Sequence, residues 1–119
     1  MKAEELRIGN LVLFKEVDLN TGQWMDSLIT IGYRDIQNLE VGSPEIKANY
    51  NPIPLTEEQL VKWGFIKDND GILVKDKCIY WLKPDIMQIA LDYAPLFNCP
   101  CSYIHQFQNL YFSLTGKEL

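Results

Sequence analysis

The last seventeen residues, Tyr103–Leu119 (YIHQFQNLYFSLTGKEL), restrict the possible folds most strongly, because their apolar residues recur with a helical period. At about 100° per residue, six apolar side chains fall within one arc of about 120°. They are Leu110, Tyr103, Leu114, Phe107, Tyr111 and Ile104. An apolar face of this width has to be buried, so the stretch predicts an amphipathic helix packed on other elements. Ser102 is the expected N-cap.

One aromatic residue of this helix, Phe112, lies outside the apolar arc. It is about 80° beyond Ile104 and next to His105, the only histidine of the chain, with Gln108 and Asn109 on either side. Two interpretations follow. Another element of the same domain covers Phe112, for which the N-terminal segment is a candidate. Alternatively, these four polar and aromatic side chains bind a partner or a second copy of the chain, since aromatic residues are enriched in interfaces.

A second helix is predicted by the sequence Thr56-Glu57-Glu58-Gln59, which has the pattern of a capping box. The Thr56 hydroxyl can accept from the amide of Gln59, whose side chain can reach back to Thr56. Gly64 can supply the left-handed C-terminal cap. The helix has only about two turns, so packing must stabilise it.

The N-terminal part of the chain predicts a short helical turn at Ala3–Leu6 and then a β-hairpin. Leu11–Phe14 is a continuous apolar run, typical of a strand buried on both faces. Asn20–Gly22 is the expected turn, and Ser27–Tyr33 is rich in the β-branched residues of a return strand. Trp24 lies near the tip of this hairpin, where it either forms a platform for a ligand or folds back over the sheet edge.

The segment that follows is less regular. Ile36–Gly42 predicts a continuation of the strand or an irregular loop, and Glu45–Tyr50 alternates apolar and polar residues as a strand does.

The region after the capped helix predicts a β-meander. Asp68–Gly71 is a hairpin turn of the Asp-Gly type between two short apolar runs. Cys78–Leu82 is a further strand. Met87–Tyr93 alternates like a strand with one apolar face, although a helix starting at Pro84 is the alternative. Pro95 and Pro100 predict that residues 94–101 are irregular.

These patterns together predict a single globular α+β domain over residues 1–119. It has a β-rich N-terminal half, a short capped helix, a β-meander and a C-terminal helix packed on the sheet. A chain of this length can bury roughly two-thirds of its unfolded surface, so neither a metal nor a disulfide is required for a stable core.

Charge and composition restrict the partners. The chain has 11 basic and 16 acidic side chains, a net charge of −5 and no cluster of Lys or Arg. It therefore lacks the electrostatic attraction on which non-specific binding to nucleic acid depends. No apolar run approaches the ~20 residues that span a bilayer. Acidic residues stand where a signal peptide would have its apolar stretch, so we expect a cytoplasmic protein without a membrane partner.

Two kinds of site chemistry are conceivable at the cysteines. Cys78, Cys99, Cys101 and His105 are ligand types that zinc accepts, but the spacing Cys-Pro-Cys is shorter than in structural zinc sites. A cysteine nucleophile with His105 as its base would need Gln106 or Asn109 to orient the imidazole. No known nucleophile motif surrounds these cysteines. We therefore expect no metal, no cofactor and no enzyme activity.

Three blocks of the sequence resemble a family. MKAEELRIGNLV, NPIPLTEEQLVKWGF and YIHQFQNLYFSLTGKEL are similar to small uncharacterised proteins from phage and mobile-element regions of gut anaerobic bacteria. The resemblance implies an intracellular accessory protein of a mobile element without enzyme activity. LRIGNLV also resembles the first strand of SH3-like small barrels.

The leading functional hypothesis is a non-catalytic accessory module that binds another protein or a second copy of itself. Its expected contact residues are His105, Gln108, Asn109 and Phe112, with Trp24 as a second candidate. The alternative is a nucleic-acid-associated accessory module that uses the SH3-like half. A small cysteine-dependent enzyme is the third hypothesis.

Overall fold

The computed structural model describes residues 1–76, 78–82, 86–91 and 94–119. The chain forms two compact units. The first unit consists of residues 1–53 and 103–119, and the second unit of residues 54–102. Helices and antiparallel sheets occur in both units, so the predicted α+β class is confirmed. The single domain over residues 1–119 stays a prediction.

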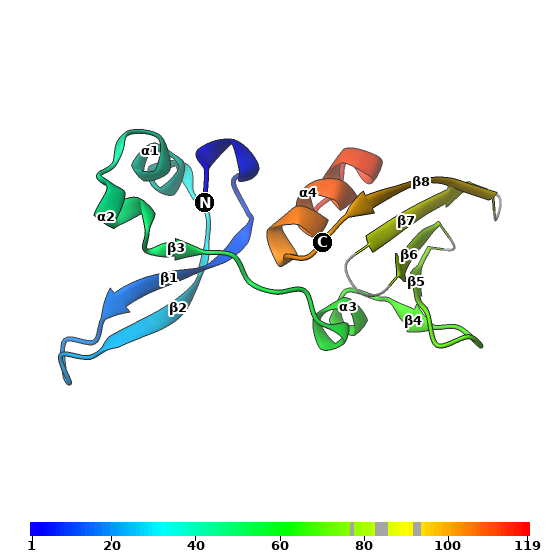
Figure 1. The fold of residues 1–119 in the computed structure, drawn as a ribbon, viewed down its shortest axis with the longest axis horizontal. Coiled ribbons are helices and arrows are strands. Elements are labelled where there is room, and N and C mark those ends of the chain that lie inside the picture. The colour runs from blue at the N-terminus through cyan, green and yellow to red at the C-terminus, as the bar shows by residue number, and fades with distance from the viewer. Residues whose placement is uncertain (77, 83–85, 92–93) are drawn as a thin grey trace. The chain divides into compact units, whose positions relative to one another are not determined.

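The first unit is built on a three-stranded antiparallel sheet with the order β2-β1-β3. A short 3₁₀ helix (Ala3–Glu5) precedes it, as expected. β1 (Leu11–Val17) and β2 (Trp24–Thr30) pair along their whole length, and β3 (Tyr50–Asn51) lies on the other side of β1 (Figure 1). The predicted hairpin is thus confirmed, although its return strand begins at Trp24 and ends at Thr30.

One face of this sheet forms a core. Val12 is fully buried and packs with Ile31, Leu39 and Tyr50. Val12 is also the only fully buried residue of the run Leu11–Phe14, which is therefore not enclosed on both faces as predicted. The other three residues of that run are only partly buried.

Two helices follow the hairpin, and here the sequence-based predictions were wrong. α1 (Tyr33–Val41) replaces the end of the return strand and the loop expected at residues 36–42. It begins at Gly32, whose amide donates to the carboxylate of Asp35 (2.8 Å). This contact satisfies one of the free amides of the first turn.

α2 (Pro44–Lys47) occupies residues 45–47, half of the strand predicted at residues 45–50, of which only Tyr50 belongs to a strand, β3. The Ser43 hydroxyl accepts from the amide of Ile46 (3.3 Å), and Pro44 stands at the first helical position. Serine as N-cap followed by proline is a helix-start signal that outweighs an alternation of three apolar residues.

The C-terminal helix α4 (Ile104–Thr115) is present and contacts β1. It starts one residue later than predicted, because Tyr103 is the N-cap: the Tyr103 amide donates to the side chain of Gln106 (3.2 Å). It ends at Gly116, whose left-handed φ of 71° suits a glycine C-cap. Ile104 and Phe107 are buried, whereas Leu114 is 42% exposed, so the buried face covers only the first turns.

The second unit contains α3 (Glu57–Lys62) and a five-stranded antiparallel meander with the order β4-β5-β6-β7-β8. The Thr56 hydroxyl accepts from the Gln59 amide (3.2 Å), and Gly64 has a φ of +93°, as the capped-helix prediction requires. The strands are β4 (Ile66–Lys67), β5 (Leu73–Lys75), β6 (Ile79–Leu82), β7 (Ile86–Leu91) and β8 (Ala94–Pro100).

Two predictions in the meander have different outcomes. β7 is a strand, which decides against a helix after Pro84; positions 92 and 93 of the predicted strand lie outside the described residues. β8 is a strand where an irregular segment was predicted. It is the last strand of the sheet, and edge strands tolerate proline because one side of their backbone has no strand to bond. The pairing also shifts register beside Pro95.

Candidate functional site

The polar face of α4 binds the N-terminal segment of the chain, residues 5–11. The side chain of Gln108 is 8% exposed, and its oxygen accepts from the Leu11 amide (2.8 Å). Its nitrogen donates to the Gly9 carbonyl (3.4 Å). Gln108 therefore pairs with the backbone at the start of β1 much as a neighbouring strand would.

Asn109 continues this contact. Its nitrogen donates to the Glu5 carbonyl (2.9 Å), and its oxygen accepts from the side chain of Asn10 (2.9 Å). Asn10 is fully buried. A buried amide side chain needs such partners, because an unpaired polar group would cost about 1–3 kcal/mol.

Phe112 lies one turn further along α4 and is covered on one side by Arg7. The guanidinium carbon is 4.1 Å from the centre of the Phe112 ring, and Arg7 also forms an ion pair with Glu118. Phe112 keeps 38% of its surface exposed. These contacts match the interpretation that the N-terminal segment covers Phe112. A binding role for the remaining exposed part stays a prediction.

His105 is 2% exposed, and its ring stacks on Tyr103 with 6.0 Å between ring centres. Burial lowers the pKa of the imidazole, while the nearby Glu5 carboxylate opposes this shift. Among the described residues, Nδ1 has no hydrogen-bond partner. His105 lines a small pocket of about 370 Å³ together with Glu5 and Tyr103. The side chain is thus mostly inaccessible to solvent, and burial favours its neutral form.

Trp24 lies apart from these residues, on the outward face of the hairpin. Side chains alternate between the faces of a strand, so Trp24, Asp26, Leu28 and Thr30 share the face opposite to the core. Trp24 is 62% exposed and Leu28 63% exposed. Val17, the cross-strand neighbour of Trp24, is 41% exposed. The structure therefore places an apolar patch here, which we call the hairpin patch: Val17, Trp24 and Leu28.

Among the described residues, no strand pairs with β2 on the side away from β1. Antiparallel pairs alternate between hydrogen-bonded and non-hydrogen-bonded positions. At one end of the hairpin the Ile31 amide donates to the backbone carbonyl of Asn10 (2.7 Å). At the other end the Asp18 amide donates to the backbone carbonyl of Gln23 (2.8 Å). When this alternation is followed along β2 from either of these two hydrogen bonds, the same backbone amides and carbonyls point away from β1. They belong to Trp24, Asp26, Leu28 and Thr30.

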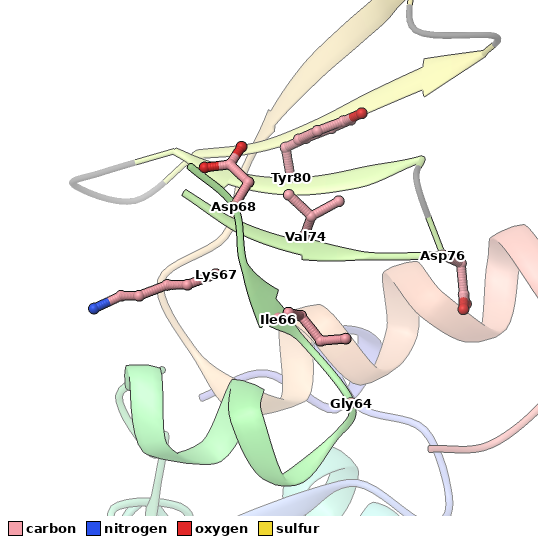
Figure 2. A pocket seen from close by; sticks show the side chains of 7 residues that line it. All are labelled: Gly64, Ile66, Lys67, Asp68, Val74, Asp76 and Tyr80. Atoms are coloured by element: carbon pink, nitrogen blue, oxygen red, sulfur yellow. The ribbon is translucent and has the colours of Figure 1, made fainter. Parts of the chain in front are cut away.

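A second concave surface lies on the sheet of the second unit. Ile66, Val74 and Tyr80 are directly opposite one another on β4, β5 and β6 and form the floor of a groove of about 620 Å³ (Figure 2). Asp68 and Asp76 line it as well. Lys67 lines the groove too, and its ammonium lies 3.6 Å from Glu57. The groove combines an apolar floor with a few charged groups, which suits binding.

The three cysteine thiols have raised pKa values. Burial raises the pKa of Cys78 and Cys99, and it raises the pKa of Cys101 to about 12. The reactive species is the thiolate, so a raised pKa makes a thiol less reactive at pH 7. The described residues contain no group of three or more His, Cys, Asp or Glu side chains that could hold a metal ion.

Sequence reasoning found Trp24 but missed Leu28 and Val17, the other members of the hairpin patch. The signal was available in the hairpin register: once the turn is placed, Val17 faces Trp24, and Leu28 is four residues further on the same face.

No family model matches this chain, and neither a curated protein nor a solved structure is similar to it. Within the described residues, every helix is too short or too polar to cross a bilayer.

Proposed function

We propose that this chain is a non-catalytic protein-interaction module whose binding surface is the hairpin patch. The observation that carries the proposal is the exposure of Trp24 and Leu28, each more than 60% accessible on the same face of one strand. Exposed apolar side chains that share one face, here on either side of Asp26, are candidates for an interaction site, and tryptophan is among the residues that contribute most to binding energy.

The contacts of α4 support this choice of surface over the helix. Gln108 and Asn109 already bond the backbone of residues 5–11, and His105 is buried. A partner would have to displace these internal hydrogen bonds to reach them. Within the described part of the chain, the side chains of Trp24 and Leu28 form no hydrogen bond that a partner would have to displace, so their exposed apolar area is available for binding.

The test is affinity capture from the native host with two matched double variants. Trp24→Ser with Leu28→Ser removes two side chains of the hairpin patch. Val61→Ser with Ile66→Ser removes two side chains of similar exposure, 56% and 74%, from the second unit. We expect wild type and the second pair to retain the same partner, and the first pair to lose it while its circular dichroism stays native.

Retention of the partner by the Trp24 and Leu28 variant would contradict the proposal. So would a partner that is lost only with Val61 and Ile66, since it would assign binding to the groove of the second unit.

A further inference from the structure

The four sheet edges of the described residues differ in how well they are protected. β3 and β4 have two residues each. β8 contains two prolines, Pro95 and Pro100, which have no amide to donate. β2 has seven residues, no proline and only one charge, Asp26. Proteins normally blunt exposed edges with short strands, prolines or lysines, so β2 is the one edge that could still pair with a further strand.

The open edge and the hairpin patch coincide. The residues whose backbone groups point outward, Trp24, Asp26, Leu28 and Thr30, are the same residues whose side chains lie on the exposed face. A strand added beside β2 would form backbone hydrogen bonds with these four residues and place its own side chains beside Trp24 and Leu28 on the same face. Strand addition of this kind gains affinity from the backbone and specificity from alternate side chains.

The charge of the hairpin decides between two possible partners for the edge of β2: β2 of a second copy of the chain, and a segment of another protein. Residues 11–30 contain one basic residue, Lys15, which lies directly opposite Asp26 on β1, and three acidic ones, Glu16, Asp18 and Asp26, so the hairpin has a formal net charge of −2 and Asp26 is the only charge on β2 itself. Pairing β2 with β2 of a second copy would bring two such hairpins together, and like charges close to one another on a sheet are destabilising. A basic segment is attracted by the same charges.

We propose that the edge of β2 binds an extended, basic segment of another protein as an added antiparallel strand, with a Lys or Arg opposite Asp26. This inference rests on the proposed function, because it assigns a binding mode to the surface identified there. It adds the backbone conformation of the partner and the sign of its charge.

The test uses the full chain labelled with ¹⁵N and three capped seven-residue peptides of alternating Val and Thr. The first has a central Lys, the second a central Glu, and the third is the Lys peptide with its alternate backbone amides methylated. At low ionic strength, we expect the Lys peptide to slow hydrogen exchange of the Trp24, Asp26, Leu28 and Thr30 amides by about tenfold. The Met25, Ser27 and Ile29 amides already face β1 and serve as internal controls.

Each outcome has a defined meaning. Weak or absent protection by the Glu and methylated peptides supports the inference. Equal binding of the methylated peptide would overturn it and leave the hairpin patch as a binding surface without strand addition. Equal binding of the Glu peptide would contradict the inference that the partner segment is basic. If protection of these amides grows with protein concentration and sedimentation shows a dimer, the inference is overturned and the edge of β2 binds a second copy of the chain. No protection with any peptide would also overturn the inference, and the capture experiment then decides the proposed function independently.

Discussion

At the start of β1, the side chain of Gln108 forms the backbone hydrogen bonds that a neighbouring strand would form. Gln108 accepts from the Leu11 amide and donates to the Gly9 carbonyl, and it is nearly inaccessible to water. Gln108 stabilises the fold through the backbone groups to which it bonds, because a buried donor without a partner costs more free energy than a hydrogen bond contributes.

Replacing Gln108 by Leu should therefore lower the free energy of unfolding by about 2 kcal/mol, since the Leu11 amide loses its partner. Urea unfolding followed by circular dichroism measures this. Gln37→Leu is the matched control: Gln37 is exposed on α1 of the same unit, and its replacement should change stability by less than about 0.5 kcal/mol. Equal effects of the two variants would show that the Gln108 contact is not important for stability.

His105 provides a pH dependence that one substitution can test, because the chain has no other histidine. Burial holds its pKa below the 6.5 of a free imidazole, so the unfolded chain takes up this proton at higher pH than the folded chain. The free energy of unfolding should thus fall as the pH decreases below about 6.5 and the folded-state pKa is approached.

The measurement is urea unfolding at about pH 7.5 and about pH 5.5, above and below the free imidazole pKa. His105→Phe keeps a ring of similar shape and has no proton to bind, so the variant should lose less stability between these two pH values than wild type. The same loss in both proteins would mean that other groups cause the acid sensitivity.

At the scale of elements, α3 depends on its cap. It has six residues, too few to be stable alone, and the Thr56 hydroxyl satisfies the Gln59 amide at its N-terminus. Thr56→Ala should destabilise the protein by about 1 kcal/mol, whereas Thr56→Ser keeps the acceptor and should cost much less. Thermal unfolding of the two variants side by side tests this, and an equally large loss for Ser would assign the effect to the missing methyl group instead.

Elements with a local signal were predictable, and elements with competing signals were not. The hairpin has a turn between two apolar runs, and α3 has Thr56 as its N-cap, so both follow from neighbouring residues. Residues 45–50 carry an alternation that favours a strand, but Ser43 and Pro44 start a helix before it. β8 needed knowledge of the sheet order, because prolines are compatible with a strand only at an edge.

At the scale of the whole molecule, the candidate sites depend on contacts between residues far apart in the sequence. Helical periodicity placed Gln108, Asn109 and Phe112 together, but nothing local shows that residues 5–11 meet them, since 97 residues separate Leu11 from Gln108. Trp24 is similar: its position near a hairpin tip was predictable, whereas the open edge of β2 follows only from the strand order.

The central claim is that the polar face of α4 binds residues 5–11 of the same chain and that the hairpin patch binds the partner. The most direct test compares partner retention by the Trp24→Ser, Leu28→Ser double variant with that by Phe112→Asp. We predict that the hairpin variant loses the partner, while Phe112→Asp, if folded as judged by circular dichroism, retains it. Loss of the partner by a folded Phe112→Asp variant, with retention by the hairpin variant, would contradict the account and assign binding to α4.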